Sequence, residues 1–385
     1  MVSSWRMARS MIVRGYNLIK PALYVSLNGI EVTNAVNEVS VTLNGHQEPN
    51  NCEIKIDNND GLNNNVLNYG KDEVFIQMGY YADTPDMLGQ DISYIGERYK
   101  TLEPLFRGWV DTKTLNISKD SGNTITLTAR DATQFLIDSK LTARFGDNSS
   151  GAGMTIENII RKLAELSHMP LRLNLPEAYK FEAYPAFEVD EKSYWDIALD
   201  IASIAGLDTY VDIDGTWYFG VYEDYDIYLF EFELGKNISN LEGKLNMPNS
   251  VVGEVIVSAY DENKQAQNAG IASYDYLIPE TEIGVFQKRK MLIVNDYAVK
   301  PGLAKFLAQQ RLNEEQRKLK TVTLNSQFGI PFIKESVCIL LKGCGIFDQY
   351  YWIRETTHTQ SKDGGYVMTL NADRVMEGET IEVSE

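Results

Sequence analysis

The sequence predicts a mainly β protein with an α+β insert, in which two duplicated β-barrel domains flank a small α/β module. Short segments rich in β-branched and aromatic residues, separated by Asn, Asp and Gly, fill residues 21–131 and return after residue 226. Helical periodicity is concentrated between these two regions. One short stretch of sequence recurs, with changes, in both of these strand-rich regions. These observations together give the fold class.

Four parts are expected along the 385 residues, which suffice for several domains of about 100–200 residues each. In chain order they are an N-terminal arm (1–20), the first barrel (21–138), the α/β module (139–225) and the second barrel (226–385), which contains a helix near 302–320.

The strands of the first barrel are predicted from apolar residues that recur at every second position. In NTITLTA, Ile125, Leu127 and Ala129 alternate with threonines, so one face is apolar and the other carries hydroxyl groups. The segments ALYVSLNG, NEVSVTLNG, CEIKIDNNDG, EVFIQMGYY and LFRGWVDTKTLNIS have similar composition. We therefore expect half-buried strands.

Two helices are expected in the α/β module. The first has Thr155 as N-cap and an apolar stripe formed by Ile156, Ile159, Ile160, Leu163 and Leu166. The second begins at Ser193, has Asp196 three residues later and ends at Gly206. Asp214-Gly215 then predicts a hairpin turn.

Strand character resumes at FEFELGKN and continues to TIEVSE, with a polar interruption near 262–290 and a helix that starts near Pro301.

The repeated phrase is SKDSGNTITLTARD at 118–131 and SKDGGYVMTLNADR at 361–374, which align without a gap and place Gly122 on Gly365. A common glycine hairpin explains the turn alone. The strands before it also correspond, and VSVTLNGHQEPNNCEIKIDNND matches LEGKLNMPNSVVGEVIVSAYDEN as strand, Leu-Asn turn, strand and acidic turn. The same order of matches predicts an internal duplication. A trimer of such chains would present six similar faces around a three-fold axis.

Charge and composition narrow the function classes. The net charge of −18 argues against binding to nucleic acid or to an anionic membrane. No apolar run suits a membrane span, and the N-terminus does not have the pattern of a secretory signal, so we expect residence in a cytoplasm. Three cysteines (Cys52, Cys338, Cys344) and three histidines (His46, His168, His358) give no metal-site spacing, and we expect no metal or cofactor.

Acidic residues suggest a calcium loop and a catalytic carboxylate pair, but neither matches the full sequence pattern of such a site. Asp57-Asn58-Asn59-Asp60-Gly61 resembles a calcium loop but has Ile56 at an acidic place and no closing glutamate, so a turn with Asx caps is expected. A carboxylate pair for glycoside cleavage would use Asp212 and Asp214, with further acids at Glu188, Asp190 and Glu191. Because Asp214 belongs to the hairpin turn and no nucleophile or zinc motif occurs, we expect no catalytic residues.

Four aromatic residues lie on corresponding strands of the two halves: Phe106, Trp109, Tyr351 and Trp352. Packing in the cores or at a ring interface is the expected role, with a ligand-stacking platform as the alternative.

Several of these segments, taken in order, resemble a known family. They are LFRGWVDTKTLNISKDSGNTITLTARDATQFLID, MTIENIIRKLAE, SYWDIALDIASIAGLDTYVDIDGTWYF, AKFLAQQRLNEEQRKLK with KTVTLNSQ, and YYWIRETTHTQSKDGGYVMTLNADR. Their order is similar to that in the baseplate hub proteins of contractile-tailed phages and phage-tail-like particles, the late control protein D and PBSX-type hub group. No single motif is diagnostic, and residues 262–290 and the N-terminal arm have no match.

The resemblance implies two tail-tube-like β-barrels per chain and a homotrimer that forms a pseudo-six-fold ring. Its partners would be the tail tube protein on one side and a spike or tail-associated lysin on the other, with a LysM-type baseplate adaptor and the tape measure protein as further partners. Its place would be the baseplate of a virion or tail-like particle assembled in the bacterial host cytoplasm. DNA would at most pass through, and an acidic lumen would repel it.

Three functions are thus compared. The first is a structural hub without chemistry of its own. The second is a tail-associated cell-wall hydrolase with carboxylates in 139–225. The third is a monomeric β protein that binds carbohydrate or a surface.

Overall fold

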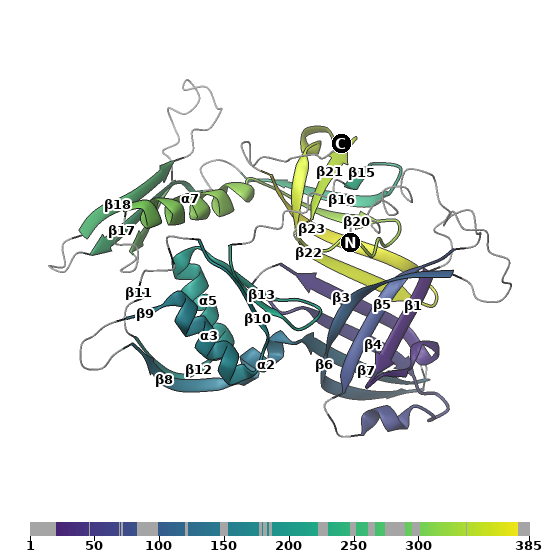
Figure 1. The fold of residues 1–385 in the computed structure, drawn as a ribbon. Coiled ribbons are helices and arrows are strands. Elements are labelled where there is room, and N and C mark those ends of the chain that lie inside the picture. The colour runs from purple at the N-terminus through teal and green to yellow at the C-terminus, as the bar shows by residue number, and fades with distance from the viewer. Residues whose placement is uncertain are drawn as a thin grey trace.

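The computed structural model describes residues 21–45, 47–68, 70, 72–82, 99–119, 122–146, 153–176, 179, 183–184, 187–221, 230–246, 252–260, 266–273, 289–294, 301–335 and 337–375. Two strand-rich halves lie edge to edge, with a helical module beside them and a small helix-covered sheet at the far end of the molecule (Figure 1). The N-terminal arm and His46 lie outside the described residues.

The first half contains seven strands. They are β1 (Pro21–Leu27), β2 (Ile30–Glu31), β3 (Val36–Asn44), β4 (Asn51–Asp57), β5 (Glu73–Ala82), β6 (Tyr99–Ser118) and β7 (Gly122–Asp131). Their core side is aliphatic and includes Val39, Ile54, Ile76 and Leu127, all fully buried. As predicted, Ile125, Leu127 and Ala129 face this core while the threonines between them do not.

The second half repeats this plan. Its strands are β15 (Phe230–Glu233), β16 (Ile238–Leu245), β20 (Lys320–Ser326), β21 (Cys338–Lys342), β22 (Tyr350–Ser361) and β23 (Gly365–Arg374). The neighbour order β3-β4-β7-β6-β5-β1 of the first half becomes β16-β20-β23-β22-β21-β15 in the second. Each strand has a counterpart at the same place in the chain order. The internal duplication is therefore visible in the topology.

One part of the predicted alignment was wrong. The segment after β16 was matched to β4, but β16 pairs with β20, and the residues between them leave the sheet. They form β17 (Val252–Tyr260), β18 (Ala266–Ser273), β19 (Arg289–Val294) and α7 (Pro301–Arg317). Periodicity identifies β17 as a strand but cannot say which neighbour it pairs with. The polar region near 262–290 also contains β18, for which the sequence has no clear alternating pattern.

The two halves share one sheet, which among the described residues has 13 strands. The joining contact is between β22 and β3, which run antiparallel from Glu355 opposite Asn44 to Ser361 opposite Glu38. Each half has its own apolar cluster, and Tyr366 of β23 packs into the cluster of the first half.

The middle module packs helices against short strands. Its elements are α2 (Thr133–Asp138), β8 (Lys140–Phe145), β9 (Met154–Thr155), α3 (Ile156–Ser167), β10 (Leu171–Asn174), β11 (Ala183–Tyr184), β12 (Phe187–Ser193), α5 (Tyr194–Ala205), β13 (Asp208–Val211) and β14 (Trp217–Gly220). Thr155 and Ser193 accept the predicted capping hydrogen bonds, and Gly206 ends α5 with positive φ.

Helix α7 connects the inserted sheet to this module. Leu307 and Leu312 are buried against β17, while Arg311 donates from Nη2 to the hydroxyl and carbonyl of Ser203 at 2.7 and 3.0 Å. None of the described helices is long and apolar enough to cross a membrane.

Candidate functional site

The seam between the two halves is the region in which the duplicated strands make long-range contacts. On one face of the β22–β3 pair, hydroxyl groups meet: Ser40 with Thr359 at 3.2 Å and Thr42 with Thr357 at 3.3 Å. At the turn of the β22–β23 hairpin, the Lys362 ammonium donates to the Asn37 side chain at 2.9 Å. Backbone pairing and side-chain hydrogen bonds thus fix the register.

A buried polar cluster lies on the other face of the seam. His358 has no exposed surface, and its Nε2 is 2.9 Å from the Ile333 carbonyl oxygen while its Nδ1 is 2.8 Å from the Tyr366 hydroxyl. A carbonyl oxygen only accepts, so Nε2–H donates to it and Nδ1 accepts from Tyr366. Burial lowers the pKa of His358 to about 4, which keeps the ring neutral.

The loop between β20 and β21 completes the cluster. Tyr80 of the first half donates its hydroxyl to the Gly329 carbonyl at 2.7 Å, and the Gly329 N–H donates to the Tyr366 carbonyl at 2.8 Å. A Cβ on Gly329 would lie 2.2 Å from the Tyr366 ring, so this close approach requires glycine. Lys334 of the same loop reaches the Pro104 carbonyl at 3.3 Å. The loop therefore fastens the second half to the first.

The corresponding positions of the first half lack this cover. The β6–β7 and β22–β23 hairpins pair in step, with Ser118 opposite Gly122 and Ser361 opposite Gly365. Counting back from these turns, Leu115 corresponds to His358 and Ile117 to Gln360. Leu115 and Ile117 are 42% and 74% exposed, whereas His358 is 0% and Gln360 8% exposed. Within the described part of the chain, no strand pairs with the outer edge of β6 at Thr112–Ile117, or with the outer edge of β16.

Each hairpin carries a β-bulge and an ion pair at the same place, with the charges exchanged. The bulged residue is Asp111 in β6 and Arg354 in β22. Asp111 accepts from Arg130 at 2.6 and 3.0 Å, while Arg354 donates to Asp373 at 3.1 and 3.2 Å. The duplicated copies have thus diverged while the interaction has been retained.

The face of the shared sheet opposite the cores is rich in hydroxyl and amide groups. The residues on β6, β7, β22, β23 and β20 that contribute them are Thr112, Thr114, Asn116, Thr124, Thr126, Thr128, Thr357, Thr359, Thr369, Asn371, Thr321, Thr323 and Asn325. Several of the acids on this face are paired with bases, as in Lys55 with Glu38 at 2.6 Å and Lys244 with Glu242 at 3.8 Å. Glu53 and Glu355 also lie on this face, so the acidic lumen expected from the net charge stays a prediction.

The four predicted aromatic residues occupy corresponding strands but have different surroundings. Phe106 is 1% and Tyr351 0% exposed, in the cores of the first and second half. Trp109 lies opposite Glu73 on β5, and Trp352 lies at the corresponding place opposite Cys338 on β21. Trp109 packs edge-on against Phe135 of the middle module, with ring centroids 4.6 Å apart. Three of these positions thus serve packing within the chain.

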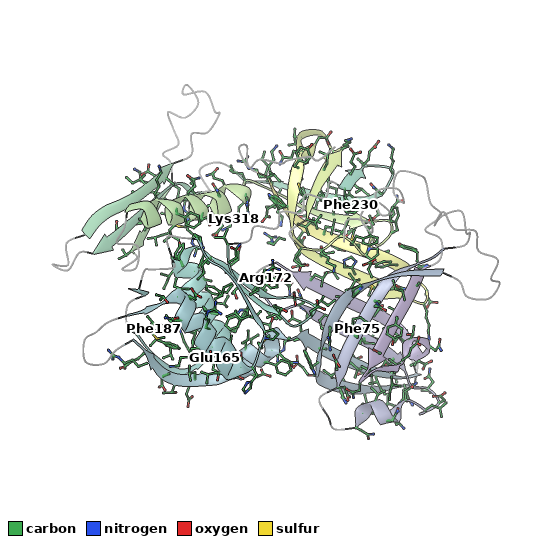
Figure 2. All side chains as sticks on the ribbon, viewed as in Figure 1. Phe75, Glu165, Arg172, Phe187, Phe230 and Lys318 are labelled. Atoms are coloured by element: carbon green, nitrogen blue, oxygen red, sulfur yellow. The ribbon has the colours of Figure 1, made fainter. Side chains whose placement is uncertain are left out.

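The predicted carboxylates are engaged in local structure. Asp212 Oδ1 accepts backbone N–H bonds from Asp214 and Thr216 at 3.0 and 2.8 Å, and burial raises its pKa. Glu188 pairs with Arg144 at 2.7 Å, and Asp190 accepts from Thr142 at 3.0 Å. Phe187 and Glu165 mark this module in Figure 2, and Phe75 and Phe230 mark the two halves. These bonds belong to turns and to a strand pair.

The loop after β4 forms Asx turns, as the sequence predicts. Asp57 accepts from the N–H of Asn59 and Asp60 from the N–H of Leu62, both at 3.0 Å. Asn59 in turn accepts from the N–H of Asn123 at 2.7 Å, which attaches the loop to the β6–β7 turn. Among the residues that the structure describes, no group of three or more His, Cys, Asp or Glu is placed to hold a metal ion.

Sequence reasoning missed the buried cluster of His358, Tyr366, Tyr80 and Gly329. A signal was present, because His358 and Gln360 occupy positions of an alternating strand that carry Leu115 and Ile117 in the other copy. Polar residues at such places indicate a core position with specific partners, or an interface.

Comparison with known proteins gives a structural answer only. No protein-family model matches the sequence, and no curated protein matches it. Among solved structures, a tail protein from Neisseria meningitidis MC58 superposes with a TM-score of 0.63 at 14% identity, covering 92% of this chain and 96% of that one.

Two further structures are similar over most of the chain. The 43 kDa tail protein of prophage MuSo2 from Shewanella oneidensis gives a TM-score of 0.58 at 15% identity, with 91% and 96% of the two chains covered. A component of the type VI secretion system of E. coli, described as structurally similar to the T4 tail proteins gp27 and gp5, gives 0.53 at 12% identity, with 92% and 77% covered. The chain therefore has the fold of these tail proteins.

Proposed function

We propose that this chain is a structural protein of a contractile phage tail or tail-like particle, and more specifically its baseplate hub. Three copies form a pseudo-six-fold ring that adapts the hexameric tail tube to a trimeric spike. The tail-protein fold over more than nine-tenths of the chain supports the tail assignment. The chain has no catalytic role in this proposal.

The observation that carries the proposal is the fusion of two copies of one barrel through a shared sheet. Because β22 of the second copy pairs with β3 of the first, the chain already contains one seam of a ring. Among the described residues, β16 is the first strand of the sheet order, and the outer edge of β6 at Thr112–Ile117 has no strand paired with it. Two unlike edges give a head-to-tail interface, which closes into a ring when the rotation permits.

The proposed partners and location follow from the resemblance of the ordered sequence segments to those of baseplate hub proteins. We propose the tail tube protein and a spike or tail-associated lysin as axial partners, and a LysM-type adaptor and the tape measure protein as others. The protein would then reside in the baseplate, after assembly in the bacterial host cytoplasm. DNA would pass along the hydroxyl-rich face without a stable contact.

The test is the mass in solution, measured by light scattering or sedimentation, with and without the tail tube protein of the same particle. We expect a trimer, or a monomer that trimerises on tubes or on the spike. A stable monomer that neither trimerises nor binds tubes overturns the proposal.

A parallel assay with purified peptidoglycan separates the hub from the hydrolase alternative. We expect no release of soluble fragments from wild-type protein. Release that disappears in Asp212→Asn and Asp214→Asn variants would instead establish the carboxylates as catalytic.

A further inference from the structure

We infer that the outer edge of β6 at Thr112–Ile117 binds β16 of a second copy of this chain, in one defined antiparallel register. The inference rests on the proposed function and adds the partner strand, the register and the side chains of the contact.

The register follows from the internal seam. Strands β3 and β16 carry a bulge at the same place, Asn37 and Ser239, and pair in step with β4 and β20. Strands β22 and β6 correspond through their hairpins. Transferring the β22–β3 pairing to β6 and β16 therefore fixes every partner. The resulting pairs are Thr112 with Asn246, Lys113 with Leu245, Thr114 with Lys244, Leu115 with Gly243, Asn116 with Glu242, and Ile117 with Leu241.

Both strands of the proposed contact, β6 and β16, carry exposed apolar side chains at the paired positions. Leu115 and Ile117 on β6 are 42% and 74% exposed, and Leu245 on β16 is 48% exposed. Leu115 would lie opposite Gly243, where the Phe347 ring lies within 2.5 Å of the position that a Cβ would take. The partner thus offers an aromatic surface beside a residue without a side chain. Burial of these groups favours association.

A second contact follows from the loops. In the internal seam, the loop after β20 lies on Tyr80 and Pro104. The corresponding loop of the first half, after β4, carries Leu62, which is 79% exposed. The corresponding receiving surface of the second half lies between β21 and β22 and carries Ile346, 67% exposed. The two loops therefore extend the apolar contact beyond the strand edges.

Charges along the proposed pair are compatible. Lys113 is already engaged by Asp72 and the Asn68 carbonyl, and Lys244 and Glu242 pair with each other on β16. No residue of β6 places a like charge opposite either of them, which would be destabilising. The seam between copies is thus aliphatic, whereas the internal seam is built on the His358 hydrogen bonds.

Engineered disulfides test the register, in a Cys344→Ser background that removes the partly exposed thiol. Thr114→Cys with Lys244→Cys should give covalent oligomers on oxidation with oxidised glutathione. The matched internal control is Thr357→Cys with Thr42→Cys, the same positions in the seam within the chain, whose hydroxyl oxygens are 3.3 Å apart. It should give a monomeric product without free thiols.

A shifted pair, Thr112→Cys with Lys244→Cys, tests a slip of two residues. Chains with Thr114→Cys alone, mixed with chains carrying Lys244→Cys alone, should yield dimers only. Oligomers from the shifted pair, homodimers from Thr114→Cys alone, or no cross-link while the internal control forms would each overturn the inference. A trimer that binds tubes without forming the 114–244 cross-link would refute this register and leave the hub proposal intact.

A charge in the apolar contact gives an independent measurement. Ile117→Asp should weaken self-association by about 100-fold, because a carboxylate would be buried without a partner. Leu292→Asp, at a residue 66% exposed on β19, is the control and should leave association unchanged. Equal effects of the two variants would contradict the inference.

Discussion

The two halves of this chain have the same strand order but differ in what covers the hairpin strand. In the second half, β22 lies against the first half, and its side chains His358 and Gln360 are buried. In the first half, β6 extends beyond β5 and pairs there with β7 alone, and the corresponding Leu115 and Ile117 are exposed. The difference shows that one copy has adapted to a permanent neighbour in the same chain, through hydrogen bonds that need fixed geometry. The other presents exposed aliphatic side chains, which the proposed contact between two copies would cover.

The largest expected effect is a difference in unfolding free energy between alanine substitutions at His358 and at Leu115, which occupy the same position in the two copies. His358→Ala should lower the free energy of unfolding by about 4 kcal/mol, because the Tyr366 hydroxyl and the Ile333 carbonyl lose their partner in a dry site and a cavity remains. Leu115→Ala should cost less than about 1 kcal/mol in the free chain, since that side chain is 42% exposed. Urea unfolding of both variants measures the difference. Similar costs would show that the two positions are not distinct in the way the burial indicates.

The buried histidine also gives stability a pH dependence. The pKa of His358 is lowered to about 4 in the folded chain, while the unfolded chain takes up the proton near the ordinary value of 6.5. Stability from the neutral ring is therefore complete above about pH 6.5 and is lost as the pH falls toward 4, by about 3 kcal/mol in total.

Asp131 acts in the opposite direction. Burial raises its pKa to about 6, so the folded state binds a proton first and gains stability as the pH falls from 6 toward 4. The histidine contribution is therefore measured as the difference in unfolding free energy between wild type and His358→Ala. That difference should shrink between pH 6.5 and 4. A difference independent of pH would mean that His358 takes up its proton over the same pH range in the folded and the unfolded chain.

Much of the fold could be predicted from the sequence because the relevant signals are local. Thr155, Ser193 and Gly206 mark helix ends through bonds made within a few residues, and the alternation at Ile125 and Leu127 reports a half-buried strand. The repeated phrase identified corresponding hairpins because both turns need the same glycine.

What the sequence could not supply depends on pairing between distant segments. The choice of β20 over β17 as the partner of β16 is made by tertiary contacts, since both are apolar alternating strands. Likewise, His358 meets Ile333 and Tyr80 meets Gly329 only because β22 joins the edge of β3. The residues of the seam are therefore absent from the predicted site residues.

The repeated turn itself offers a smaller contrast. Gly122 and Gly365 have φ of 75° and 72°, so alanine is strained at both. At Gly365 no atom lies within 4 Å of an added Cβ, whereas at Gly122 the Asn59 side chain lies at 2.0 Å. We expect Gly365→Ala to cost about 1 kcal/mol and Gly122→Ala about 2–3 kcal/mol, because Asn59 must also release the N–H of Asn123. Thermal unfolding of the two variants checks this order, and a larger cost at Gly365 would contradict it.

The smallest expected effect concerns the exchanged ion pair, and it tests how far the copies are still equivalent. Arg130→Ala should cost about 1 kcal/mol, because Arg130 is 29% exposed and binds both oxygens of Asp111. Arg354→Ala should cost less than about 0.5 kcal/mol, because the Arg354 side chain is 57% exposed.

The double variant Asp111→Arg with Arg130→Asp gives the first hairpin the charge order of the second. If the bulge geometry is shared, this variant should regain most of the stability that either single substitution loses, as a double-mutant cycle in urea would show. Additive losses would mean that Asp138, whose carboxylate lies 3.4 Å from the Arg130 guanidinium, fixes the charge order in the first hairpin. In that case the ion pair belongs to the contact with the middle module, and the exchange records the different neighbours of the two copies.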